Sequence, residues 1–180
     1  MADETDVTCT CGRVVMRVVG RPIVCVECLC TDCQRAGALL ASLSGAPRVL
    51  DEKSATPFVL YRKDRARCRK GSDLLREHRL TEQSKTRRVV ASCCNTPVFL
   101  EFADGHWLSV YGGLWPEGAR PPLDLRTMTR DAPDGVVLSG NVANPRTHTF
   151  GFYAKLFAAW IAMGFRAPKV DYVKGALDAR

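Results

Sequence analysis

The stretch that decides the fold runs from residue 9 to residue 33 and reads CTCGRVVMRVVGRPIVCVECLCTDC. It contains two runs of β-branched and apolar residues, 13–19 and 22–28, which are typical of β-strands, and Gly20 marks a turn between them. Six of the nine cysteines of the chain lie within this stretch, inside or next to these runs. The stretch therefore predicts two neighbouring strands whose ends carry clusters of thiols.

Cys28, Cys30 and Cys33 form the densest of these clusters. Three thiols so close together are a strong signal for metal, and the last two have the spacing common at zinc sites. Asp32 is the expected N-cap of a short helix over 34–43, whose dipole would favour thiolate over thiol. Three local ligands cannot complete a tetrahedron, so the fourth position must come from elsewhere in the chain or stay open, as a catalytic zinc requires. These three cysteines are therefore the candidate catalytic residues.

A second candidate metal site combines two cysteine pairs that lie far apart in the sequence. Cys9 and Cys11 are followed by Gly12, which permits the sharp turn that two such ligands need. Cys93 and Cys94 are adjacent, and their side chains would diverge on a strand, but a turn could direct one or both at the same ion. A metal shared by the two pairs would close a loop of about 80 residues and stabilise the fold.

The two remaining cysteines are predicted to be core residues. Cys25 and Cys28 are an odd number of positions apart on one predicted strand, so their side chains point to opposite faces. Cys68 shares a strand face with Ala66, opposite the arginines around it, and a free cysteine packs there as a small hydrophobe.

Short strand patterns with turns between them dominate the rest of the first two thirds of the chain. Further strands are predicted over 57–62, 64–69, 74–80, 87–92, 98–102 and 107–111. This spacing is typical of antiparallel sheets with few helices, so we predict a mainly β fold of packed antiparallel sheets with short helices. From Pro116 the chain becomes irregular, and 150–165 then forms an apolar helical pattern.

The C-terminal helical pattern is expected to pack on the sheet or against a second copy of the chain. It is apolar on nearly every face, with Lys155 as its one charge. A helix of this length spans about 24 Å, less than the bilayer core of about 30 Å, so no membrane span is expected. The expected organisation is a zinc-binding β domain over 1–115 and a segment over 116–180 that packs on the same domain.

Composition and charge restrict the class of protein further. Hydrophobic residues make up 46% and charged residues 25%, which excludes a disordered chain. The N-terminus is acidic and lacks an apolar run, so we expect a cytoplasmic protein, whose thiols stay reduced and available to metal. The segment 62–88 carries eleven Lys and Arg against four Asp and Glu, which equals the whole net charge of +7. This basic segment predicts an anionic partner, either a small ligand or a nucleic acid.

The order of these motifs resembles the glutathione-dependent formaldehyde-activating enzyme family, which includes centromere protein V-like domains. The motifs are Cys-x-Cys-Gly at 9–12, Cys-x-Cys-x-x-Cys at 28–33 and a late cysteine pair before Thr96-Pro97, within about residues 7–112. The resemblance implies an Mss4-like fold. It also implies a structural zinc at Cys9, Cys11 and the late pair, and a second zinc at the 28–33 motif that meets a glutathione–aldehyde adduct. The activity it implies is of the carbon–sulfur lyase type.

The late motif departs from the pattern of that family, which is usually Cys-x-x-Cys-Gly-Thr-Pro. When the chain is aligned on Thr96-Pro97, Cys94 takes the place of the second cysteine, Asn95 that of the glycine and Ala91 that of the first cysteine. Cys93 is the candidate to supply the missing thiolate.

Two hypotheses of function follow from the sequence. In the first, the chain is a zinc enzyme that acts on an adduct of an aldehyde with glutathione or another thiol, and the basic segment holds the carboxylates of glutathione. In the second, one or two zinc ions are purely structural and the chain is a binding module for nucleic acid or an acidic partner, which the scarcity of aromatic residues in the basic segment disfavours. A homodimer through the C-terminal helix is compatible with both. The histidines, His78, His106 and His148, are expected to be surface or turn residues rather than ligands.

Overall fold

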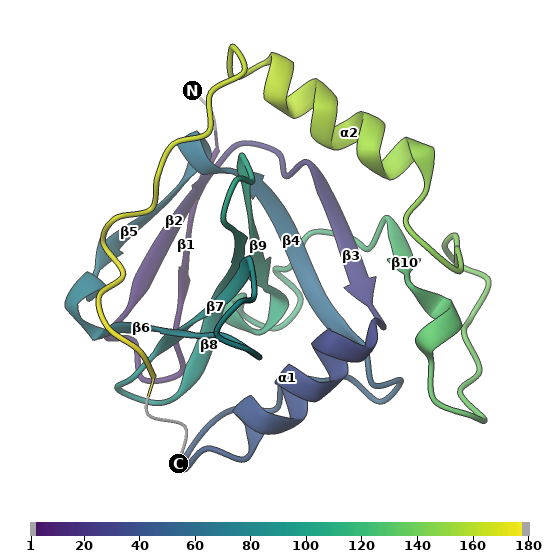
Figure 1. The fold of residues 1–180 in the computed structure, drawn as a ribbon, viewed down its shortest axis with the longest axis horizontal. Helices are drawn as coiled ribbons and strands as arrows, with labels where there is room; N and C mark the ends of the chain where they lie inside the picture. Colours follow the sequence, from purple (N-terminus) through teal and green to yellow (C-terminus); the bar gives the residue numbers. More distant parts are fainter. Residues whose placement is uncertain (1–2, 178–180) are drawn as a thin grey trace.

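The structure, a computed structural model, describes residues 3–177 and contains two β-sheets (Figure 1). The smaller sheet has three antiparallel strands in the order β1–β2–β5. These strands are β1 (Glu4–Thr8), β2 (Val15–Val19) and β5 (Ala66–Lys70). β1 and β2 form a hairpin in which the buried side chains of Val7 and Met16 belong to paired residues, so one face of this sheet is apolar.

The larger sheet has seven strands in the order β10–β3–β4–β9–β8–β7–β6. Its strands are β3 (Val24–Cys28), β4 (Thr56–Arg62), β6 (Leu75–His78), β7 (Thr86–Ala91), β8 (Thr96–Phe102), β9 (Trp107–Tyr111) and β10 (Leu125–Thr127). Neighbouring strands are antiparallel except β10 and β3, which are parallel. The prediction of a mainly β fold with antiparallel sheets is therefore confirmed.

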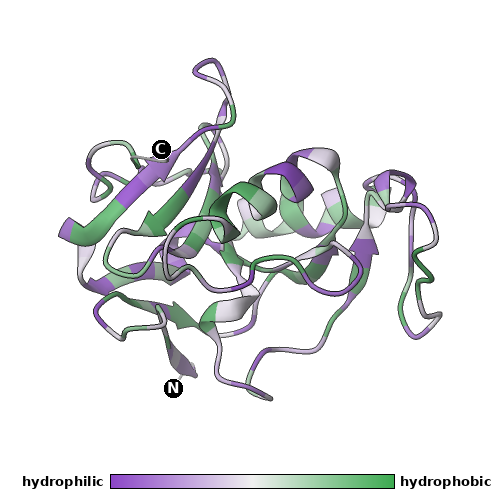
Figure 2. Ribbon diagram, turned by 90° about the horizontal axis from the view of Figure 1, so that it is seen from below, coloured by the Kyte–Doolittle hydropathy of each residue, from purple (hydrophilic) through white to green (hydrophobic). Residues whose placement is uncertain are grey.

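Helix α1 (Thr31–Ala41) follows β3 almost directly. It carries both hydrophobic and hydrophilic residues (Figure 2) and buries Cys33, Ala36, Gly37 and Leu40. The buried residues recur at helical spacing, which turns one side of α1 toward the larger sheet. This packing fixes the start of α1, and with it the cysteine motif, against the strands.

Helix α2 (Phe150–Ile161) is the C-terminal helix that the apolar pattern predicts. It begins at Thr149, whose side chain accepts a hydrogen bond from the backbone N–H of Phe152. α2 buries Phe152 and Leu156 and exposes Phe150 and Phe157. No helix in residues 3–177 combines the length and the apolar character that crossing a membrane needs.

Two hydrophobic clusters stabilise the fold. The first lies between the two sheets and includes Val7 and Met16 from the smaller sheet and Val59 and Phe99 from the larger one. The second lies between the larger sheet and the helices, where Leu40 and Phe152 belong to the same cluster as strand residues such as Phe58 and Leu60. Cys25 belongs to the first cluster and Cys28 to the second, which confirms that they point to opposite faces of β3.

Several predicted boundaries differ from the structure for local reasons. Asp32 is not an N-cap, because α1 begins earlier and Cys30 takes that position. The strand predicted over 64–69 starts at Ala66, because the residues before it form a short 3-10 helix. The 3-10 helices span Lys63–Arg65, Ser72–Leu74, Gly112–Leu114 and Thr129–Asp131. β1 and β10 were not predicted, since each is short and depends on pairing with a neighbour.

Candidate metal centres and an adjoining cavity

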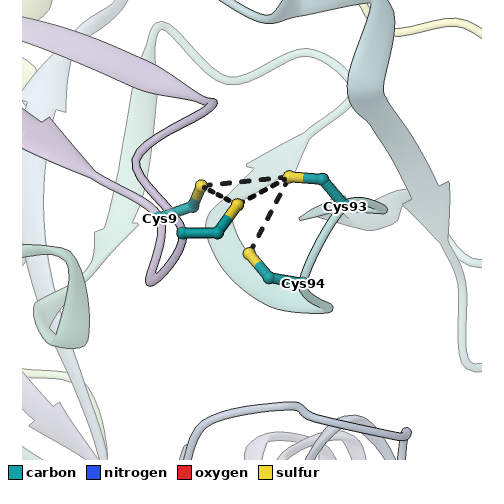
Figure 3. Close-up of side chains that lie close together, drawn as sticks. Cys9, Cys93 and Cys94 are labelled. Atoms are coloured by element: carbon teal, nitrogen blue, oxygen red, sulfur yellow. Dashed lines mark hydrogen bonds between the residues drawn. The ribbon is translucent and has the colours of Figure 1, made fainter.

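Cys9, Cys11, Cys93 and Cys94 form a four-thiol cluster, in which all sulfur atoms lie within 4.8 Å of one another (Figure 3). The Sγ–Sγ distances include 3.6 Å from Cys9 to Cys11, 3.4 Å from Cys11 to Cys93 and 3.8 Å from Cys93 to Cys94. Zinc–sulfur bonds of about 2.3 Å in a tetrahedron place the sulfurs about 3.8 Å apart. The four thiols therefore fit a closed tetrahedral metal site.

The turn between β1 and β2 presents the first two thiols. The backbone N–H of Gly12 donates to the carbonyl of Cys9 at 2.9 Å, and Gly12 has a φ of +72°, a conformation that glycine adopts at little cost. Burial raises the pKa of Cys9, and the backbone N–H of Val14, which donates to Cys9 Sγ at 3.3 Å, acts in the opposite direction. The role predicted for Gly12 is therefore confirmed.

The turn between β7 and β8 presents the other two thiols. The backbone N–H of Cys94 donates to the carbonyl of Ala91, and Asn95 adopts a φ of +52°. Asparagine is among the few residues other than glycine that tolerate this region, so Asn95 suits this position of the turn. Ala91 is a buried strand residue, and the turn instead brings Cys93 into the cluster as its fourth thiol.

Two threonine hydroxyls support the four-thiol cluster. The hydroxyls of Thr10 and Thr96 lie 2.9 Å apart, and Thr96 Oγ1 lies 3.1 Å from Cys94 Sγ. Burial acts to raise the pKa of Cys94, but hydrogen bonds from Thr10 and Thr96 outweigh it and lower the pKa to about 5. A thiol that ionises this readily suits a metal ligand, because metals bind the thiolate.

Cys28, Cys30 and Cys33 form a separate three-thiol cluster, also with all sulfurs within 4.8 Å of one another. Cys28 ends β3, Cys30 is the N-cap of α1 and Cys33 lies in its first turn. Hydrogen bonds from Cys28 and Cys33 lower the pKa of Cys30, and the charge of Arg88 acts in the same direction. Within residues 3–177 no fourth Cys, His, Asp or Glu side chain joins this cluster, so a bound metal would keep an open position.

The three-thiol cluster opens on a cavity of about 330 Å³, within the usual size range of small-molecule sites. All three cysteines line it. Most of its walls are apolar, formed by Val26, Phe58, Leu60, Leu100, Phe102, Trp107, Phe152 and Leu156. Polar lining comes from Asp32, Ser84, Thr86, Arg88, Ser109, Thr127, His148 and Tyr153. The open side of the metal site therefore faces a space that excludes much of the bulk water.

Arg88 is the basic side chain of this cavity and is only 2% exposed. Its Nη2 donates to the backbone carbonyl of Asp32 at 3.2 Å, and its Nε has no hydrogen-bond partner. Among the described residues, no carboxylate lies within ion-pair distance of it (the ion pairs of residues 3–177 involve other cations). A buried guanidinium in this state is available to an anion.

His148 also lines the cavity, which the sequence did not predict. Its Nδ1 lies 2.7 Å from Thr127 Oγ1, and its ring stacks on Phe152 with the ring centres 4.7 Å apart. Burial lowers the pKa of His148, and the charge of Cys30 acts in the opposite direction. A neutral imidazole held this way can accept or donate a proton inside the cavity.

His106 lies in the bend directly before β9, which agrees with the expectation of a surface or turn residue, but it is not at the surface. This residue is buried, and its Nε2 lies 2.8 Å from the carbonyl of Leu156. The contact of His106 with Leu156 and that of His148 with Thr127 each join segments that lie far apart in the sequence. The spacing of residues therefore gives no signal for either contact. Cys25 is buried as predicted, and Cys68 is partly buried against the first hydrophobic cluster.

The basic segment 62–88 does not act as one surface. Lys63 pairs with Glu101, Arg87 pairs with Glu77 and Glu101, and Arg62 pairs with Asp64. On β5 the side chains of Arg67, Arg69 and Lys70 are exposed at the edge of the smaller sheet. Of the basic residues of this segment, Arg88 alone is among the residues that line the cavity beside the three-thiol cluster.

Comparison with known proteins gives only distant structural likeness. No protein-family model and no curated protein matches the sequence. A crystal structure of a Rhodobacter sphaeroides protein is similar to this chain with a TM-score of 0.48 and 16% sequence identity, over 78% of this chain and 100% of the other. Likeness at this level carries no argument, so the function has to be argued from the geometry of the two thiol clusters and the cavity.

Proposed function

We propose that the chain is a zinc enzyme of the carbon–sulfur lyase type that acts on the adduct of an aldehyde with glutathione or another thiol. The observation that carries this proposal is the three-thiol cluster with an open fourth position on a partly open, mainly apolar cavity. Cys28, Cys30 and Cys33 would hold the catalytic ion, and Cys9, Cys11, Cys93 and Cys94 a structural one. A zinc with three thiolates prefers a further soft ligand, so it would supply a binding site for the sulfur of the substrate.

The side chains of the cavity have separate tasks in this proposal. The aromatic walls would exclude water and hold the adduct close to the cluster. With its Nδ1–H donating to Thr127, His148 would keep a free lone pair on Nε2 and accept the hydroxyl proton of the adduct. The electrons of that O–H bond form the carbonyl of the aldehyde, and those of the carbon–sulfur bond leave with sulfur as a thiolate. The reverse sequence joins the two molecules.

The proposal is tested by measuring the exchange of ¹³C-formaldehyde between its free and thiol-bound forms by NMR, with glutathione and with smaller thiols. We expect the zinc-loaded protein to accelerate exchange with at least one thiol. His148→Gln should lower this acceleration by about a hundredfold, the usual contribution of a general base. Cys30→Ser should lower it as well, whereas Cys68→Ser, outside the cavity, should not. If no thiol exchanges faster with protein than without it, the proposal is wrong.

The remaining parts of the proposal concern location and partners. None of the nine cysteines forms a disulfide, which favours a reducing compartment such as the cytoplasm. The exposed Arg67, Arg69 and Lys70 of β5 are the surface that a nucleic acid would meet if the chain were instead a binding module. Two copies of the chain would pair through the apolar residues that α2 exposes, such as Phe157 and Ile161.

A further inference from the structure

Among residues 3–177, three Lys and Arg side chains are almost fully buried, and they differ in which groups compensate their charge. Lys63 lies 2.5 Å from Glu101, and Arg126 lies 2.8 Å from Glu27. Arg88, the least exposed of the three, has no carboxylate partner among residues 3–177. A buried charge without a partner costs free energy, so its persistence at the wall of a cavity calls for an anion that is not part of the chain.

The thiolates of the three-thiol cluster compensate this charge only in part. Arg88 is close enough for its charge to affect Cys30, and its hydrogen bond to the carbonyl of Asp32 fixes it beside the first turn of α1. Three thiolates around a divalent cation leave one net negative charge, which would attract the guanidinium. The guanidinium nevertheless has five N–H donors, and its Nε is without an acceptor.

The composition of the cavity restricts what this anion can be. Its walls are mostly aromatic and aliphatic, and Arg88 is the one Lys or Arg side chain among those that line it in residues 3–177. Glutathione carries two carboxylates and an ammonium group. Asp32 lines the cavity and would meet the ammonium group, but Arg88 can pair with only one of the two carboxylates, so the cavity matches glutathione poorly. A short thiol with a single carboxylate and an otherwise apolar body matches one guanidinium, three thiols and apolar walls.

We infer that Arg88 binds a carboxylate of the substrate and that the preferred substrates are adducts of mercaptocarboxylates rather than of glutathione. This inference rests on the proposed function, because it assumes that the sulfur of the substrate reaches the three-thiol cluster. Arg88 is then a specificity-determining residue, because it selects thiols that carry a carboxylate. The three-thiol cluster binds the sulfur of any thiol that enters the cavity.

The test measures thiol binding to the cobalt-substituted protein, since the visible absorption of cobalt changes when a thiolate joins its ligands. The ligands are 3-mercaptopropionate and its methyl ester, which differ by one charge, and glutathione is the third ligand. The variants are Arg88→Gln, Arg88→Lys and, as a matched control, Arg35→Gln, which removes the same charge from an exposed position of α1. The four-thiol cluster is already complete, so its cobalt absorption provides a constant background and reports folding of each variant.

We expect wild type to prefer the acid to the ester by about tenfold to a hundredfold, the range expected of a hydrogen bond between charged groups. Arg88→Gln should abolish this preference, Arg88→Lys should keep part of it, and Arg35→Gln should leave it unchanged. The acid and the ester also differ in the acidity of their thiols. This difference is the same for every variant, so it cancels when the ratio of the two affinities is compared between variants. Wild type should also bind 3-mercaptopropionate more tightly than glutathione.

Three other outcomes would overturn the inference, and they are distinguishable. If the ester binds but Arg88→Gln weakens acid and ester equally, Arg88 only supports the metal thiolates, and the proposed function stands without this specificity. The same holds if glutathione binds more tightly than 3-mercaptopropionate. If no thiol changes the cobalt spectrum of wild type, the thiol-binding site itself is refuted, and both proposals fall.

Discussion

At the scale of single residues, the place of each of the nine cysteines in the fold, and not its spacing in the sequence alone, decides whether it joins a thiol cluster. Cys11 is exposed in a turn and joins a cluster, whereas Cys25 is buried on a strand, in the core, and joins none. Cys93 belongs with Cys11, although adjacency to Cys94 would separate the two side chains on a regular strand. The turn after β7 removes that restriction, so the identity of the fourth ligand depends on the local backbone.

The assignment of Cys93 leads to a prediction about metal content. Wild-type protein should retain one zinc ion after dialysis against a chelator strong enough to empty the three-thiol cluster, and Cys93→Ala should retain none, since the substitution leaves both sites with three thiols. Elemental analysis of the dialysed proteins measures this directly. Cys68→Ala is the control and should retain one ion, as wild type does. An ion that is held equally tightly in Cys93→Ala would mean that Cys93 is not a ligand.

At the scale of secondary-structure elements, α2 forms a wall of the cavity through a small number of buried side chains. Phe152 and Leu156 face inward and line the cavity, whereas Phe157 is 53% exposed on the other side of the helix. His106 adds a hydrogen bond to the carbonyl of Leu156. The position of α2, and with it the enclosure of the cavity, depends on these contacts.

We therefore expect Phe152→Ala to loosen α2 while leaving the sheets folded. Loss of about 3 kcal/mol of packing corresponds to a rate of amide hydrogen exchange about a hundredfold faster over residues 150–161. Hydrogen–deuterium exchange with mass spectrometry measures it segment by segment. Phe157→Ala removes a side chain of the same kind from the exposed side and should leave exchange unchanged. Equal effects of the two substitutions would show that α2 is not held by its inner face.

At the scale of the whole molecule, the four-thiol cluster joins the two sheets. Cys9 and Cys11 come from the hairpin of the smaller sheet, and Cys93 and Cys94 from the turn between β7 and β8 of the larger sheet. A metal bound there would close a long loop and hold the sheets against their common core. The three-thiol cluster, in contrast, comes from one continuous stretch and links β3 to α1.

This difference predicts that the two ions contribute unequally to stability. Complete removal of metal should lower the midpoint of thermal unfolding by more than about 10 °C, because structural zinc contributes several kcal/mol of folding free energy. Calorimetry with and without a strong chelator measures the change. Chelation should still lower the unfolding midpoint of Cys30→Ser by most of this amount. It should lower the unfolding midpoint of Cys93→Ala by little. The opposite ranking would assign the stabilising ion to the three-thiol cluster.

The sequence by itself determined the class of fold and the three-thiol cluster, whereas only the turn after β7 decided that both Cys93 and Cys94 join the four-thiol cluster. Runs of β-branched and apolar residues such as 13–19 favour a strand locally, and dense cysteine motifs keep their chemistry wherever the fold places them. β10 has no comparable signal, because its three residues form a strand only by pairing with β3. Tertiary structure alone decided that β10 lies beside β3.

Tertiary structure also decided the chemistry around the three-thiol cluster. Arg88 looks like one charge among many in a basic segment, and only the packing of β7 against α1 buries it without a carboxylate. His148 reaches the cavity because Thr127 and Phe152 hold its ring there. Whether a side chain is buried and whether it has a partner depend on contacts across the whole fold. The local sequence does not determine either property.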